Sequence, residues 1–303
     1  FRRNGKEVDA EVRGVLVERM KDSLELTVSQ KKVFENLEEL FGSENQGWKS
    51  LQSPFEGVKM EFKHQQHGKG ERSIALGRAE GTADATAEEA CAWFFEYCSR
   101  ERVKVDREEG HPGKLEIRLR ERMANEKMFA AVKKMPFRLD NREFVFKYIW
   151  KRNADNSMSV AAWPIKDKVD YGGDMGNLVR GITKLLFTAK HIKTNSGIPQ
   201  CKLELLQYAD AGGHIPVSLV NRNMPYALST IKAVSDTFAR DGMVDEDALK
   251  YLVNIIKNEP QDYSEEENVA IRKAKEFYEK CKESANLYSL LSPDKRVEMN
   301  GVH

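Results

Sequence analysis

Apolar residues recur at helical spacing over residues 29–41, where Val33, Leu37 and Phe41 share one face of a predicted helix. A glycine follows this stretch and predicts its end. The stretch before it, residues 1–28, is charged and has no clear period, so we expect a linker there, or a helix that belongs to the preceding region.

Alternation of apolar and polar residues predicts strands on both sides of a second helix. Thr86 and Glu89 are spaced as a capping box, which predicts that this helix begins at Thr86 and runs through Cys98. Two strands precede it and about six follow it, the clearest over residues 142–150. A last long amphipathic helix is predicted over residues 216–240. Strands in series followed by a helix are typical of an α+β fold with an antiparallel sheet.

Composition narrows the class of protein. The 303 residues are 40% hydrophobic and 32% charged, enough for a sizeable core. Lys and Arg number 49 against 48 Asp and Glu, so a formal net charge of +1 gives no general attraction to nucleic acid. No run approaches the ~20 apolar residues of a membrane span. Four scattered cysteines without a CxxC motif indicate reduced thiols, and we expect a cytoplasmic location.

Motifs for catalysis or metal binding are scarce. The chain has no nucleophile elbow, no phosphate loop and no Gly-x-Gly-x-x-Gly stretch. His64 and His67 could supply half of a metal site, but no nearby cysteine or acidic pair completes it. We therefore expect a protein that is not an enzyme and that holds no metal or cofactor.

The end of the chain repeats a stretch from its beginning. Residues 48–60 align without a gap on residues 287–299, with six identities in thirteen positions and an offset of 239. Tandem repetition explains this better than chance. We expect a helical connector over residues 242–286, and the first strand of a following repeat over residues 287–303. Neighbouring domains of the same chain would then be partners.

Three stretches carry a resemblance to a known family: Arg142-Glu-Phe-Val145, Ala162-Trp-Pro164, and Gly213-His-Ile-Pro216 followed by Asn221. Together with the order of elements, they resemble the START (StAR-related lipid transfer) domain family over about residues 33–240. The resemblance implies a helix-grip fold (START/Bet v 1-like), with a curved antiparallel sheet wrapped around a long C-terminal helix. The START-like domain would span residues 29–241.

A tunnel between the sheet and the last helix, filled by one lipid or sterol-like small molecule, is what this resemblance implies. Gly212 and Gly213 would let the chain turn sharply into the helix, because glycine has no Cβ to clash. The residues expected to line the tunnel are apolar side chains on strands and on the last helix: Phe129, Phe144, Phe146, Tyr148, Trp163, Val220, Met224, Ala227, Ile231 and Val234. Ordinary core packing is the alternative for each of them.

The expected tunnel departs from that of sterol-binding members of the family. Those members carry a buried Arg and an acidic residue at positions that correspond to Tyr148 and about Phe129 here. We therefore expect a wholly apolar pocket with one Tyr hydroxyl. The loop over residues 164–176 lies where the family has a mobile gate, although a plain surface loop is an equal alternative.

Three functions remain open. The first is non-catalytic binding, and transfer, of a lipid with transient contact to a membrane. The second is a ligand-free START-like scaffold or interaction module in a large protein. The third is an enzyme on the same fold, for which Tyr148 is the single candidate group. Cavity volume separates the first two, because a filled core would leave no room for a lipid.

Overall fold

The computed structural model describes residues 5–42, 47–64, 74–117, 124–135, 139–194, 198–258 and 263–290. The chain divides into two compact units, residues 1–248 and residues 249–303. Within the described ranges, no helix combines the length and the apolar character that a membrane span requires.

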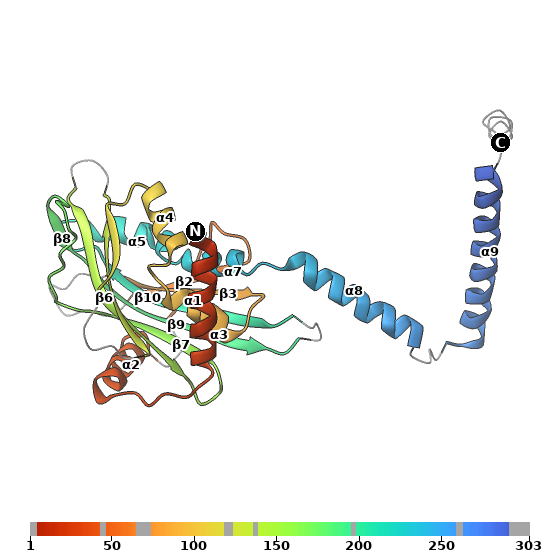
Figure 1. Cartoon of the computed structure of the whole chain (residues 1–303), viewed down its shortest axis with the longest axis horizontal. Coiled ribbons are helices and arrows are strands. Elements are labelled where there is room, and N and C mark those ends of the chain that lie inside the picture. The colour runs from red at the N-terminus through yellow and green to blue at the C-terminus, as the bar shows by residue number, and fades with distance from the viewer. Residues whose placement is uncertain are drawn as a thin grey trace. The chain divides into compact units, whose positions relative to one another are not determined.

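The first unit is built on a ten-stranded sheet in the order β1-β2-β3-β10-β9-β7-β6-β5-β4, with β8 beside β6 (Figure 1). Neighbours along this order are antiparallel, whereas β8 is parallel to β6. The strands are β1 (Lys49–Leu51), β2 (Lys59–His64), β3 (Ala75–Ala83), β4 (Gly113–Ile117), β5 (Glu126–Lys133), β6 (Asn141–Arg152), β7 (Met158–Pro164), β8 (Leu178–Arg180), β9 (Ile182–Ile192) and β10 (Gln200–Asp210).

Helices precede, interrupt and follow the strands. They are α1 (Gly5–Met20), α2 (Val28–Phe41), α3 (Ala87–Phe95), α4 (Arg100–Glu108), α5 (Val217–Arg222), α6 (Met224–Ala227) and α7 (Thr230–Thr237). The predicted capping box starts α3: the Thr86 side chain accepts a hydrogen bond from the Glu89 amide, and the Glu89 carboxylate accepts one from the Thr86 amide. The order of elements confirms the predicted α+β class.

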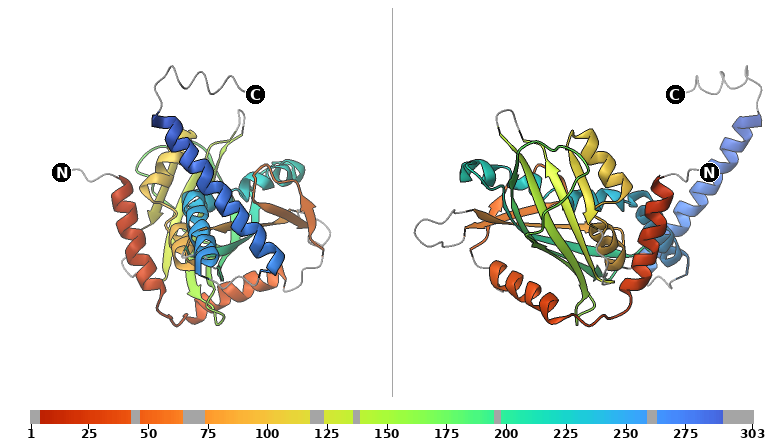
Figure 2. Two further views of the ribbon diagram at one scale, coloured as in Figure 1. Left: turned by 90° about the vertical axis from the view of Figure 1, so that its right-hand side faces the viewer. Right: turned by 60° about the vertical axis from the view of Figure 1, so that its left-hand side comes forward.

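The two faces of the sheet carry separate hydrophobic clusters, because side chains alternate along each strand. On β6, Phe146, Tyr148 and Trp150 join the cluster that includes α3 and α7, and we call this face the inner face. Ile149 joins the other cluster, in which α2 packs on the outer face. The views in Figure 2 show α2 separated from α3 and α4 by the curved sheet.

The turn into the last helices requires glycine, as the sequence predicted. Gly212 and Gly213 have φ of 68° and 61°. A Cβ on Gly212 would lie 2.5 Å from the carbonyl oxygen of Arg180, closer than real Cβ atoms approach another atom. The chain therefore reverses tightly against β8 before Ile215 enters the core.

The predicted long helix over residues 216–240 is broken into α5, α6 and α7, which corrects the sequence analysis. Pro225 lies in the first turn of α6, and its nitrogen has no proton to donate to the turn before it. The segments nevertheless grip the inner face, because Leu228, Ile231 and Val234 are fully buried in its cluster.

Two boundaries also differ from expectation. Residues 5–20, for which a linker or a helix of the preceding region was expected, form the helix α1, and Met20 at its end is fully buried in the core of the first unit. The second unit contains most of α8 (Asp241–Asn258) and all of α9 (Glu265–Leu290). Residues 287–290, expected to begin a strand, lie in α9, and residues 291–303 lie outside the described ranges. The repeated strand itself therefore stays a prediction.

Candidate ligand cavity

A cavity of about 740 Å³ lies on the inner face of the sheet. Side chains of the strands β4, β5, β6, β9 and β10 line it, together with side chains of the helices α3, α4, α6 and α7. The described residues thus leave a hollow between the sheet and the helices that cover it. Its volume falls within the ~300–1,000 Å³ of small-molecule sites.

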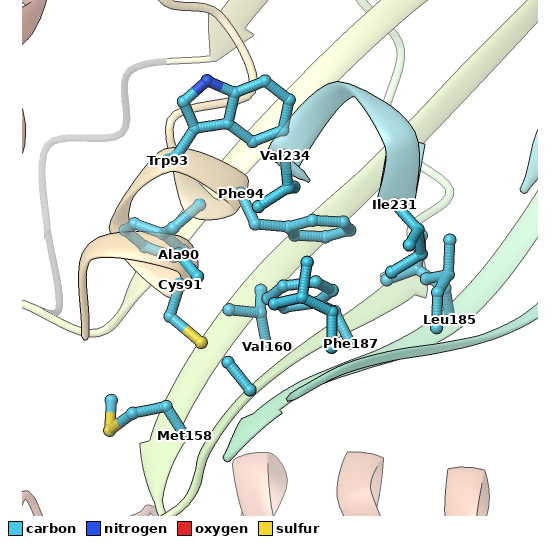
Figure 3. Packing of buried hydrophobic residues seen from close by; sticks show 14 of the residues in the cluster. Ala90, Cys91, Trp93, Phe94, Met158, Val160, Leu185, Phe187, Ile231 and Val234 are labelled. Atoms are coloured by element: carbon cyan, nitrogen blue, oxygen red, sulfur yellow. The ribbon is translucent and has the colours of Figure 1, made fainter. Parts of the chain in front are cut away.

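Aromatic rings bound the cavity where α3 meets the sheet. The Phe94 ring stacks on Phe187 at 4.2 Å between centroids and on Tyr148 at 5.6 Å. Figure 3 shows Phe94 extending from α3 toward Phe187, with Ile231 and Val234 of α7 nearby. Tyr97 makes an edge contact with Phe146 at 5.1 Å. These rings pack against one another and form an apolar wall of the cavity.

A buried ion-pair cluster, defined here as Asp106, Lys114 and Lys133, borders the cavity beside these rings, with Nζ of Lys114 4.0 Å from the Tyr97 ring centroid. The Asp106 carboxylate lies 2.7 Å from Nζ of Lys114 and 2.5 Å from Nζ of Lys133. The Lys114 side chain is 6% exposed. Burial, reinforced by the nearby Arg102 charge, lowers the pKa of Lys114 to about 8 despite its bond to Asp106. Burial acts to raise the pKa of Asp106, but its bonds to the two lysines outweigh burial and lower it.

Arg102 adds a third cation to the lining beside this cluster. Its Nη1 donates to the carbonyl oxygens of Trp93 and Phe94, at 3.2 and 3.3 Å, and so caps the end of α3. The guanidinium carbon lies 4.4 Å from the Trp93 ring centroid and 5.1 Å from that of Tyr97. No carboxylate in the described part of the chain forms an ion pair with Arg102. Three cations, Arg102, Lys114 and Lys133, therefore line the cavity together with the carboxylates of Glu101, Asp106 and Glu109.

Asp106, Glu109 and His111 bring ligand atoms within 4.8 Å of one another, which is the spacing of a metal site. Both Asp106 oxygens are occupied by lysine ammonium groups, and these positive charges oppose a divalent cation. Burial, followed by the charge of Lys133, lowers the pKa of His111. We interpret the group as part of the ion-pair wall.

Comparison with known proteins bears on the fold. No protein-family model and no curated protein matches the chain. Among solved structures, human StAR-related lipid transfer protein 5 matches with a TM-score of 0.52 and 20% identity, over 71% of this chain and 94% of that chain. The fold is the START-type helix grip. The human StarD13 lipid transfer and protein localization domain matches at a TM-score of 0.49 with 14% identity, over 72% and 100% of the two chains.

Four residues predicted for the tunnel line this cavity: Phe144, Phe146, Tyr148 and Ala227. Phe129 lies beneath them, fully buried, with its ring 5.3 Å from that of Tyr148. Whether these side chains contact a ligand stays a prediction.

The other five residues do not line the cavity. Met224, Ile231 and Val234 face the core, and Val220 is half-buried on α5. Trp163 is on the outer face, where Nζ of Lys184 lies 4.9 Å from its ring centroid. The register of β7 explains this position, because Trp163 pairs with outward-facing Lys147 and Ala162 pairs with Tyr148. Side chains alternate along a strand, so Val160 and Ala162 share the inner face and Trp163 faces outward; this alternation could have predicted its position.

The sequence analysis missed the charged wall and expected a wholly apolar pocket. The structure supplies a buried acid–base pair from α4 and β4 instead of from the family's strand positions. Ser99 is the N-cap of α4, accepting from the Arg102 amide, and it was the available sign of a second helix. Arg102 and Asp106 are then four residues apart on one helical face.

The loop predicted as a gate is fastened to the sheet. The Tyr171 hydroxyl donates to the buried Glu143 carboxylate at 2.9 Å, and Nε of Arg180 lies 2.9 Å from the other oxygen of that carboxylate. Any opening of the loop has to break this contact. The gate therefore stays a prediction, and the contacts of Tyr171 and Arg180 with Glu143 are the ones that its opening would break.

Proposed function

We propose that the first unit binds an amphipathic molecule, a lipid or a sterol-like compound, in the cavity between the sheet and α3–α7. The observation that carries the proposal is a hollow of about 740 Å³ whose lining combines aromatic rings with buried cations. One solved protein with the same fold, human StAR-related lipid transfer protein 5, is named as a lipid transfer protein, which supports the same class of ligand. Transfer between membranes would follow if the ligand can leave through the side bordered by α4 and α6.

Magnitudes assign different roles to the apolar and the charged parts of the lining. Each CH₂ moved from water to the apolar wall contributes about 0.8 kcal/mol, so a chain of roughly fourteen carbons contributes about 11 kcal/mol before binding costs. A hydrogen bond to a charged group contributes about 1.5–3 kcal/mol. The apolar part of the ligand therefore sets affinity, and the polar wall sets selectivity.

The charged wall favours an acidic headgroup. Lys114 is buried with one carboxylate that it shares with Lys133, and burial disfavours its charged form. A phosphate or carboxylate beside Lys114 and Arg102 would accept charge-assisted hydrogen bonds from them. We expect anionic lipids to bind more tightly than neutral ones of equal chain length.

Two positions on one strand provide a matched test. Thr183 lines the cavity, whereas Thr188 lies on β9 outside the cavity, and both are partly buried. Binding of fluorescent fatty-acyl lipids with phosphate, choline and hydroxyl headgroups would be measured for the wild type and both variants. We expect Thr183→Trp to weaken binding by at least about tenfold, since it fills the hollow, and Thr188→Trp to leave it unchanged. Wild-type protein that binds none of the lipids would favour the scaffold alternative.

A further inference from the structure

The helix α8 carries an exposed apolar stripe that the proposed ligand site does not use. Leu249, Leu252 and Val253 are 60%, 50% and 43% exposed, and Ile256 continues the same face at 57%. Their spacing of three and four residues places them on one side of the helix. A contiguous apolar face of this kind marks an interaction surface.

This stripe repeats the sequence of α1. Residues 242–256 align on residues 6–20 without a gap. Val244-Asp245 falls on Val8-Asp9, Leu252-Val253 falls on Leu16-Val17, and Ile256 falls on Met20. Four of the fifteen positions are identical, and Ile256 falls on apolar Met20, whereas Leu249 falls on Arg13. Three of the four stripe positions therefore share the register of α1.

The next helix repeats α2 in the same way. Thr27 and Gln30 form the capping box of α2, and Ser264 and Glu267 exchange the same two hydrogen bonds at the start of α9. The positions of α2 that face the sheet fall on other apolar or aromatic residues of α9 at an offset of 237: Val33 on Ala270, Phe34 on Ile271, Leu37 on Ala274 and Phe41 on Tyr278. The 48–60 repeat then follows at 287–299, so three segments recur in one order.

In the first unit, the contacts of α1 show what the recurring residues do. Leu16, Val17 and Met20 pack against the core cluster to which α3 belongs. The Asp9 carboxylate accepts hydrogen bonds from the backbone amides of Arg100 and Glu101, at 3.0 and 2.9 Å. Asp9 thereby supplies negative charge at the N-terminus of α4, where the helix dipole favours it. The recurring positions are the ones that dock α1 on the α3–α4 pair.

We propose that α8 and α9 are the first two helices of a second START-type unit, and that the α8 stripe docks on the α3–α4 pair of such a unit. Leu252, Val253 and Ile256 are the apolar contacts, and Asp245 caps the N-terminus of the α4 equivalent. This assignment replaces the connector expected over residues 242–286. It does not depend on the proposed ligand.

A graft within the full 303-residue chain tests the docking. Residues 6–20 are replaced by a copy of residues 242–256, and a control carries the same fifteen residues in scrambled order. The thermal unfolding midpoint of the first unit and its near-ultraviolet circular dichroism report whether the inserted helix packs. We expect the graft to stay within about 4 °C of the wild type and the scrambled control to fall by more than about 8 °C.

A second substitution tests the cap. The change that corresponds to Asp245→Ala, made in the grafted copy, should lower the midpoint by the same few degrees as Asp9→Ala in the wild type. Equal loss of stability in the graft and the scrambled control would overturn the proposal. So would equal retention, because the α3–α4 pair would then not distinguish the α8 sequence from any helix of the same composition.

Discussion

Lys114 illustrates how one residue connects stability to the proposed selectivity. Its side chain is 6% exposed, it shares Asp106 with Lys133, and burial lowers its pKa to about 8. A lysine in the unfolded chain has a pKa of about 10.4. Between these values the unfolded chain binds a proton that the folded chain has lost, so the contribution of Lys114 to stability rises with pH.

The pH dependence of unfolding checks this effect. Relative to Lys114→Met, the wild type should gain about 1–2 kcal/mol in free energy of unfolding between pH 7.5 and 9.5. Buried thiols act in the opposite sense, because burial raises the pKa of Cys98 and of Cys201 to about 12. Both proteins share those thiols, so the comparison isolates Lys114. If urea unfolding gives the two proteins free energies of unfolding that change equally with pH, the pKa of Lys114 is not lowered by folding.

At this scale, alternation in the sequence predicts which way a strand residue faces but not which charges are buried. The common face of Phe144, Phe146 and Tyr148 is confirmed. The burial of Lys114 could not be predicted, because it depends on an aspartate from α4 and a lysine from β5 that become neighbours only in the folded chain.

At the scale of elements, the close contact between α7 and β3 determines where the cavity lies. Gly81 of β3 lies beneath Ile231, and a Cβ there would come within 2.7 Å of Cγ2 of that side chain. The small residue lets the helix approach the strand closely, which leaves the hollow on the other side of α7.

A pair of glycine substitutions tests the close packing of α7 on β3. Gly81→Ala should lower the free energy of unfolding by about 1–3 kcal/mol, because overpacking forces α7 away from β3. Gly14→Ala is the control: no atom lies within 4 Å of the added Cβ in α1, so the change should stabilise the protein by up to about 1 kcal/mol. Urea midpoints at an unchanged slope would measure both. A neutral Gly81→Ala would contradict the close packing of α7.

Element boundaries were predictable where local chemistry fixes them. The Thr86 capping box and the Gly212-Gly213 turn appear in the structure as the sequence predicted. The prediction of one continuous helix over residues 216–240 was wrong because it followed the apolar period and did not take Pro225 into account. The helix α4 was missed because most of its residues are charged, so it has few apolar residues whose spacing could predict a helix.

On the scale of the whole molecule, the first unit contains a complete core of its own. The two hydrophobic clusters described in it include no residue beyond Phe238. Deletion of residues 259–303 should therefore leave its unfolding midpoint within about 2 °C of the wild type and its lipid affinity unchanged. Differential scanning calorimetry would measure the midpoint. A drop of more than about 5 °C would show that the first unit depends on the later residues.

The fold class was predictable at this scale. The order of helices and strands indicated an α+β fold with an antiparallel sheet, and the resemblance to the START family implied the helix grip and a tunnel. The volume left inside depends on the stacking of Phe94 on Phe187 and on where the broken last helix rests, which no local pattern encodes.

Native mass spectrometry of the full chain purified from cells tests the central claim most directly. The account predicts a protein peak heavier than 34.7 kDa by the mass of one lipid, which disappears on denaturation and is reduced in Thr183→Trp but not in Thr188→Trp. A wild-type protein that carries no such adduct, and gains none when mixed with anionic or neutral lipids, would contradict it.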